Sequence, residues 1–259
     1  MTLRRVGFEG PVNFRDLGGY AADGGRHVRW GRLYRSDSLH TITPDDVPVL
    51  RNLGVRTAID FRSSDEIEWL GIGPLGEVSV RHVHCPTFDR TPSPEAATFQ
   101  GRTAADFYVH MLDQGSGAYV AAARSLADAD TLPAVFFCVA GKDRTGCFAA
   151  LVLGLLGVAD DVIVSDYALT QEIVPLLTAR RLARDGEHAD AERWKNIPAD
   201  LREAPAHVME TVVGHIHERW GGWAGYADAA GIESAVVTRL REELLEDDQA
   251  PSATRATSS

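Results

Sequence analysis

The chain has 259 residues, 44% of them hydrophobic and 24% charged, a composition that supports one sizeable core and excludes a fibrous or wholly disordered protein. Its formal net charge of −11 argues against binding nucleic acid or an anionic membrane through the overall field of the protein. Any phosphate site must therefore be a local concentration of positive charge.

The chain carries three cysteines, Cys85, Cys138 and Cys147. This odd and sparse set argues against a disulfide framework and indicates a reducing compartment. The first ten residues lack an apolar signal-peptide core, and no apolar stretch approaches the length of a membrane span, so we expect no stable membrane insertion. We expect a cytoplasmic protein, while export by a route that leaves no mark in the sequence stays open.

Strands and helices alternate in the first part of the chain. The predicted elements are a hairpin at Val28–Ser36 after the turn signal Asp23–Gly25, strands at Val55–Phe61, Val78–Cys85 and Ala134–Cys138, a helix capped at Ser63, and helices at Thr103–Leu112 and Ala118–Ala129. A proline-punctuated loop is expected at Thr87–Pro94. This alternation predicts an α/β fold, with a central and mostly parallel sheet flanked by helices.

Only helices are predicted from Asp160 onward, in the segments Asp160–Leu177, Leu201–Trp220 and Ile232–Leu245. Residues 180–196 are densely charged, which fits either a mobile element near a site or a solvated helix face. This part of the chain therefore adds a helical region to the α/β fold.

We expect a single domain at residues 11–246, preceded by an extension at 1–10. A helical lid is expected to be inserted in it at about residues 172–220, where the charged segment lies. Residues 247–259 are small and polar, which is typical of a disordered tail.

The segment Cys138–Gly146 is the most informative part of the chain. An apolar run leads into it and a second one, Phe148–Leu156, leads out, which indicates a strand, a tight loop and a helix. Such a loop can point successive backbone N–H groups inward and end at a helix N-terminus, which together bind an anion. The same field favours a thiolate, so Cys138 is predicted to be a nucleophile rather than a structural cysteine.

Other residues of this loop can complete a phosphate site. Arg144 offers a planar fork that fits two phosphate oxygens, and Thr145 can hydrogen-bond the cysteine sulfur. Lys142 either contacts a further phosphate or is a solvent-exposed lysine. The remaining expected phosphate-binding residues are Val139, Ala140 and Gly141.

Three aspartates could supply the general acid that protonates the leaving oxygen. Asp60 ends a predicted parallel strand, at the edge where open α/β sheets place their sites, although an aspartate there can also cap the following helix. Asp89, on the loop after the next strand, is the second candidate. Asp143 is the third, and as a neighbour of the bound dianion it must be protonated, paired or turned away.

The loop sequence CVAGKDRTG resembles the signature of cysteine-dependent phosphatases, and its GKDRTG part resembles bacterial tyrosine phosphatases of the protein-tyrosine phosphatase B type. Further segments similar to that family are Asn13–Tyr20, Leu33–Asp37, Ile59–Ser63, Asp166–Thr170 and Gly231–Ile232. Two independent motifs in one chain make the resemblance specific. It implies a phosphatase-type α/β domain, activity on phosphotyrosine and in some members on phosphoinositides, and a lid of extra helices in some members. It also matches Asp60 to the aspartate of a family motif, which favours Asp60 as the acid.

The chain departs from this family at one position. Most such phosphatases have histidine immediately before the nucleophilic cysteine, whereas this chain has Phe137. The thiolate of Cys138 must then depend more on backbone N–H groups, the helix dipole, Arg144 and Thr145. We expect an activity profile displaced toward alkaline pH.

The sequence therefore predicts a cysteine-dependent phosphatase that uses no cofactor or metal and forms a phosphocysteine. Expected substrates are phosphotyrosine, phosphoserine or phosphothreonine in proteins, or phosphoinositides. A weakly active phospho-binding module, suggested by Phe137, and a rhodanese-type sulfur transferase are the alternatives. A metal site at His82, His84 and Cys85 is improbable, because on a strand the cysteine faces away from the two histidines. Neither the oligomeric state nor the physiological substrate follows from the sequence.

Overall fold

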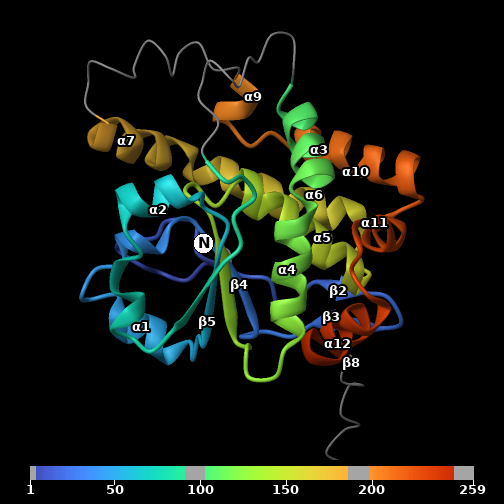
Figure 1. Cartoon of the computed structure of the whole chain (residues 1–259), viewed down its shortest axis with the longest axis horizontal. Coiled ribbons are helices and arrows are strands. Elements are labelled where there is room, and N and C mark those ends of the chain that lie inside the picture. The colour runs from blue at the N-terminus through green and yellow to red at the C-terminus, as the bar shows by residue number, and fades with distance from the viewer. Residues whose placement is uncertain (1–3, 91–102, 186–198, 248–259) are drawn as a thin grey trace, which may run out of the picture.

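The computed structural model describes residues 4–90, 103–185 and 199–247. Its centre is a five-stranded sheet in the order β1-β4-β7-β5-β6, in which only β1 runs antiparallel to its neighbour (Figure 1). The strands are β1 (Arg15–Asp16), β4 (Leu33–Ser36), β5 (Thr57–Asp60), β6 (Arg81–His84) and β7 (Ala134–Phe137). The expectation of a mostly parallel sheet flanked by helices is thus confirmed.

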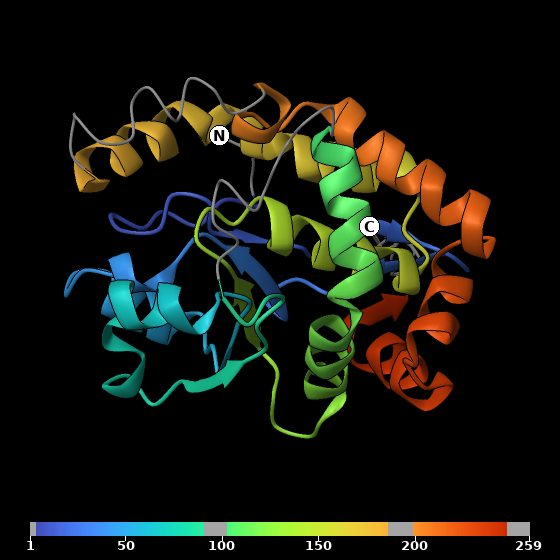
Figure 2. The same ribbon diagram turned by 45° about the horizontal axis from the view of Figure 1, so that its top comes forward.

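Helices cover both faces of this sheet. On one face lies α1 (Val47–Asn52), and on the other lie α3 to α6 and α10 to α12 (Figures 1 and 2). The bounds are α2 (Ser64–Leu70), α3 (Ala104–Gln114), α4 (Ser116–Ala127), α5 (Asp143–Leu156), α6 (Asp160–Ala168), α7 (Val174–Asp185), α9 (Ala199–Arg202), α10 (Ala206–Trp220), α11 (Trp223–Ala230) and α12 (Ser234–Leu244).

Strand β7 is buried on both faces, as its position between β4 and β5 requires. Its alternate residues enter different cores: Ala134 and Phe136 face the larger cluster with α5, whereas Val135 and Phe137 face the smaller cluster with α1. All four side chains are fully buried. The central strand therefore holds the residue that follows it, Cys138, in a fixed place.

A second, three-stranded sheet differs from the sequence expectation. Strands β2 (Ala21–Ala22) and β3 (Arg26–Val28) form a hairpin around the Asp23–Gly25 turn, and β3 pairs with β8 (Leu245–Asp247). The predicted hairpin therefore lies a few residues earlier, and the expectation of helix alone after Asp160 is wrong at β8. Periodicity could not reveal β8, because three residues are too few to show alternation.

The predicted strands and the helices before Asp160 are present with small shifts at their ends. The predicted helices Asp160–Leu177 and Leu201–Trp220 are each interrupted, the first by a 3-10 turn at Leu169–Ile173 and the second between α9 and α10, and α11 was not predicted. The predicted capping box is confirmed: Glu66 accepts from the backbone N–H of Ser63. The Thr87–Pro94 loop, the charged segment and the tail fall partly or wholly outside the described residues. No helix in the described ranges is long and apolar enough to cross a membrane.

Candidate active site

Three parallel strands end at the same edge of the sheet and bring the candidate residues together. The phosphate loop, Cys138–Thr145, leaves β7 between the ends of β4 and β5 and runs into α5. The backbone N–H of Ser38, just after β4, donates to the carbonyl of Val139 at 3.1 Å. The sequence expectation of a strand, a tight loop and a helix around Cys138 agrees with this arrangement.

Gly141 is the one position of the phosphate loop that requires glycine. Its φ is +65°, a left-handed conformation that other residues rarely adopt, and a Cβ atom there would collide with the carbonyl oxygen of Ser36. Strand β4 can approach the loop this closely because Gly141 has no side chain.

Arg144 is held by a carboxylate that sequence reasoning did not assign to the site. Its Nη1 and Nη2 donate to Oε2 and Oε1 of Glu66 at 2.5 and 2.9 Å. Burial acts to lower the pKa of Arg144, but the charges of Cys138 and Glu66 outweigh it and raise that pKa. The guanidinium is therefore permanently charged and fixed in orientation, with further N–H groups available for an anion.

Asp143, at the first turn of α5, lines the cavity beside the loop and its side chain is 27% exposed. Tyr108 donates to its Oδ1 at 2.5 Å, and Nζ of Lys142 lies 3.2 Å from the same oxygen. Burial and the charge of Asp143 raise the pKa of Tyr108 well above its usual value, so the phenol stays protonated. Asp143 is thus both reachable from the cavity and fixed by hydrogen bonds.

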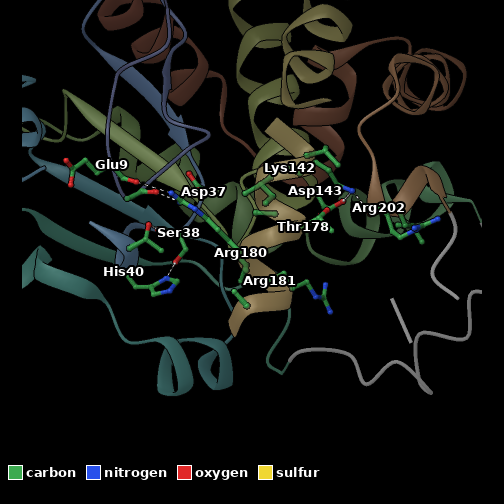
Figure 3. A pocket seen from close by; sticks show the side chains of 18 of the residues that line it. Glu9, Asp37, Ser38, His40, Lys142, Asp143, Thr178, Arg180, Arg181 and Arg202 are labelled. Carbon is green, nitrogen blue, oxygen red and sulfur yellow. Dashed lines mark hydrogen bonds and ion pairs between the residues drawn. The ribbon is translucent and has the colours of Figure 1, made fainter. Parts of the chain in front are cut away.

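The cavity next to the loop has a volume of about 760 Å³, and its lining includes Thr178 and Arg180 of α7 and Arg202 of α9 (Figure 3). Arg180 of α7 reaches across it and donates to the carbonyls of Glu9 and Gly10. Lys142 is buried, contrary to the solvent-exposed alternative, and donates to the carbonyls of Leu201 and Glu203. These bonds hold α7 and α9, which we call the cover of the cavity, in place.

Asp60 lies outside the residues that line this cavity, as do Cys138 and Arg144. Its carboxylate is fully buried and accepts from Nε and Nη2 of Arg62 and lies 2.9 Å from Nε2 of His82. Burial acts to raise its pKa, but the hydrogen bonds from His82 and Arg62 lower it. Asp60 therefore stays ionised and orders the Phe61–Ser63 turn that leads to Glu66.

The remaining predicted residues are placed as follows. Asp89 is exposed and does not line the cavity, whereas Val139 and Ala140 do. Thr145 is buried, and its Oγ1 has no hydrogen-bond partner among the described residues. This hydroxyl is thus available to a group that binds or reacts in the loop.

Phe137 occupies its position as an ordinary core residue. Its side chain is fully buried, with the guanidinium of Arg62 5.2 Å from the ring centroid. The ring gives no hydrogen bond to the loop, so the loop depends on other groups for its support.

The other cysteines and the two histidines of β6 form no metal site within the part of the chain that the structure describes. Cys85 and Cys147 are buried free thiols, and burial is the main cause that raises the pKa of each, that of Cys85 to about 11. His82 and His84 stack on one face of β6. Within the described residues, no group of acidic, histidine and cysteine side chains could hold a metal ion.

A buried polar cluster, Asn13, Arg15, Arg35 and Asp166, lies directly under the phosphate loop; we call it the loop floor. Asp166 accepts from Arg15 at 3.1 Å and from Arg35 at 2.6 Å. Burial opposes ionisation of Asp166, but both arginines lower its pKa, and burial lowers the pKa of Arg35 to about 10. Sequence reasoning placed these residues in motifs but gave them no role, because a motif does not show which distant side chains meet.

Comparisons with known proteins identify the family of this chain. The model of the tyrosine phosphatase family matches residues 6–246. A Cupriavidus necator protein named as a tyrosine-protein phosphatase is 30% identical over 252 residues, which cover 93% of this chain and 88% of the relative. The triple specificity protein phosphatase PtpB of Mycobacterium tuberculosis is 29% identical and is matched over 95% of this chain and 100% of its own length.

Solved structures show a looser likeness. The core catalytic domain of the PP-IP phosphatase SIW14 from S. cerevisiae is 14% identical with a TM-score of 0.39, over 69% of this chain and 96% of that chain. TpbA from P. aeruginosa is 22% identical with a TM-score of 0.30, over 59% and 78%. Both TM-scores are low, so family membership depends on the sequence matches.

Proposed function

Because the chain belongs to the tyrosine phosphatase family and is a phosphatase, we propose that it hydrolyses phosphomonoesters by attack of the Cys138 thiolate on phosphorus, with no metal ion. One observation carries this proposal: Cys138 begins a loop that ends at the N-terminus of α5 beside an arginine clamped by Glu66. Inward N–H groups and a fixed guanidinium stabilise the charge of the transferring phosphoryl group.

The reaction would proceed in two steps. Cys138 Sγ forms a bond to phosphorus as the bond to the leaving oxygen breaks, and that oxygen takes a proton from the general acid. Water then attacks the phosphocysteine and gives a proton back to the carboxylate of the general acid, the S–P bond breaks, and phosphate leaves as the thiolate is restored. The buried hydroxyl of Thr145 makes no hydrogen bond to Cys138 or to another described residue, and we propose that it donates to the thiolate as the thiolate is restored.

We assign the general acid to Asp143 rather than to Asp60. Asp143 lines the cavity, so its carboxyl can be reached by the leaving oxygen of a bound phosphomonoester. Asp60 instead holds Arg62 and the turn before Glu66, so its contribution is to position Arg144. The exposed Asp89 is supported by neither argument.

We propose phosphotyrosine as the main substrate class. The cavity is large enough for an aromatic ring and has apolar walls from Phe107, Val174 and Leu177. Basic side chains at its edge, among them Arg181 and Arg202, would suit a further phosphate of a phosphoinositide or a neighbouring anionic group of a peptide. The mycobacterial relative is named a triple specificity protein phosphatase, which supports testing other phosphorylated substrates as well, namely phosphoserine, phosphothreonine and phosphoinositides.

The first test compares wild type with Cys138→Ser in the presence of a chelator, on a phosphotyrosine peptide and on phosphatidylinositol 3-phosphate. We expect hydrolysis by wild type and none by the variant, and the ratio of the two rates chooses between protein and lipid. If Cys138→Ser retains activity, the thiol mechanism is wrong. If wild type binds the peptide but does not hydrolyse it at any pH, the binding-module alternative suggested by Phe137 replaces it.

The assignment of the acid has its own test, because a good leaving group needs no proton. Asp143→Asn is expected to lose about 10²–10⁴-fold in kcat on phenyl phosphate and far less on p-nitrophenyl phosphate. Asp60→Asn is the matched control, and its loss should be the same on both substrates. If Asp60→Asn instead loses more activity on phenyl phosphate than on p-nitrophenyl phosphate, Asp60 is the general acid.

A further inference from the structure

We propose that Asn13 and Arg35 are positioning residues that keep the carbonyl groups of the phosphate loop turned away from the anion, an inference that rests on the proposed function. Nδ2 of Asn13 donates to the carbonyls of Ala140 and Gly141, both at 3.1 Å. Nη2 of Arg35 donates to the carbonyl of Gly141 at 2.9 Å. With the bond from Ser38 to Val139, three consecutive loop carbonyls are bound from outside.

These bonds matter because each peptide group presents its N–H and its C=O in opposite directions. A loop that binds an anion needs the N–H groups inside and the carbonyl oxygens outside. Gly141, at φ +65°, is where the backbone could change orientation most easily, since glycine adopts many conformations. A carbonyl turned inward would repel the phosphate dianion, and the donors from Asn13 and Arg35 oppose that movement.

The rest of the loop floor fixes these two donors. Nη1 of Arg15 donates to Oδ1 of Asn13 at 2.5 Å, so the amide nitrogen of Asn13 must face the loop. Asp166 binds Arg15 and Arg35 together, and the side chains of all three are at most 2% exposed. Two buried cations and one anion leave a net positive charge beneath the phosphate, which favours an anion in the loop.

This arrangement gives a physical role to two sequence motifs that lie far from Cys138 in the chain. Asn13 and Arg15 belong to the N-terminal NFRDLGG segment, and Arg35 belongs to the LYRSD segment. The bonds described above bring both segments to the outer face of the same loop. We infer that their shared task is to preorganise the backbone donors before the substrate arrives.

The experiment measures two independent quantities in wild type, Asn13→Asp, Asn13→Ala and Arg35→Lys. One is kcat and KM on p-nitrophenyl phosphate, and the other is the Kd of tungstate, a tetrahedral oxyanion that binds without reaction. Asn13→Asp replaces the donor amide by a carboxylate that repels the carbonyls, whereas Asn13→Ala removes the donors without adding charge. Tyr20→Phe is the control, because this change removes a partly buried hydrogen bond to Asp166 and the Tyr20 hydroxyl donates to Asp166 rather than to the loop.

Asn13→Asp and Asn13→Ala are each expected to weaken tungstate binding and to lower kcat by about 10- to 100-fold, as the loss of a residue that orients a ligand typically does. Arg35→Lys keeps a positive charge and a donor, so it should retain part of the tungstate affinity and part of kcat. Tyr20→Phe should change neither quantity by more than about twofold. Folded Asn13 variants that bind tungstate as wild type does would overturn the inference, and so would a wild type that binds none. Hydrolysis tests the proposed function separately: if wild type binds tungstate but is inactive, loss of binding in the variants still supports the positioning role.

Discussion

The loop floor and the cover of the cavity hold the two sides of the same site in different ways. The floor is built of mutually paired side chains that are almost completely buried, with Asp166 shared between Arg15 and Arg35. The cover, α7 and α9, is held by charged groups that donate to backbone carbonyls, such as Arg180 to Glu9. Arg180 itself is only half-buried.

This difference separates the part of the site that must be rigid from the part that can move. Buried ion pairs with several hydrogen bonds resist displacement, because each released charge would remain desolvated. A guanidinium that leaves a carbonyl at the surface regains water, so releasing α7 at Arg180 costs little, whereas α9 is also held by the buried Lys142. We infer that the phosphate loop is preorganised, and we propose that substrate enters by movement of the cover.

The largest effect expected from this comparison is on stability, through the floor. Asp166→Asn removes the charge that compensates two buried arginines, and we expect the free energy of unfolding in urea to fall by about 3–5 kcal/mol. Asp160→Asn, which weakens a half-exposed pair with His217, is the control and should lose less than about 1 kcal/mol. Equal losses in the two variants would contradict the distinction.

A second prediction concerns the pH dependence of stability through Asp37, which lies between the loop floor and the cover. Asp37 lines the cavity, and burial raises its pKa to about 6, against the N–H bonds from Asn13 and Val12 that lower it. Because the folded pKa lies above the unfolded value, this group's stabilising contribution is complete below about pH 4 and is lost as pH rises through 6.

Wild type should therefore lose about 1–3 kcal/mol from this group between pH 4 and pH 7, and Asp37→Asn should not. The measurement is the free energy of unfolding of both proteins across that range. If the difference between them does not change with pH, the carboxyl of Asp37 is not the group that titrates.

The smallest effect is expected from a change in the cover, and it should alter the accessibility of Cys138 rather than the stability of the protein. Cys138 is only 1% exposed. Arg180→Ala removes the bonds to Glu9 and Gly10, and we expect iodoacetamide to alkylate Cys138 about tenfold faster, equivalent to about 1.4 kcal/mol of easier opening. Arg239→Ala, whose pairs stay on α12, should leave the rate unchanged. An unchanged rate in Arg180→Ala would mean that α7 is not the barrier.

Much of the fold could be predicted because its signals are local. The apolar run before Cys138, the loop residues after it and the capping box at Ser63 each follow from spacing alone. Strand β8 could not, because its pairing with β3 joins residues more than 200 positions apart.

The prediction of the site residues has the same limit, because it also depends on contacts between distant parts of the chain. Sequence reasoning identified Cys138 and Arg144 from one short segment, but it treated Glu66 only as a helix cap and preferred Asp60 as the acid. Both judgements depend on which side chains meet across strands: Asp60 meets His82 of β6, and Glu66 meets Arg144 of α5. The contact between Glu66 and Arg144 joins residues 78 positions apart, and no spacing rule contains it. That Asp143 rather than Asp60 is the acid is our proposal, supported by such contacts.

Glu66 links the end of a helix to the occupancy of the site. One oxygen, Oε2, accepts from the backbone N–H and hydroxyl of Ser63 and from Nη1 of Arg144. An anion bound to Arg144 weakens the attraction between Arg144 and Glu66. Glu66 then accepts more strongly from Ser63, so binding in the loop should stabilise the first turn of α2. Slower deuterium exchange at the Ser63 amide would then report binding in real time, without a label or a chromogenic substrate.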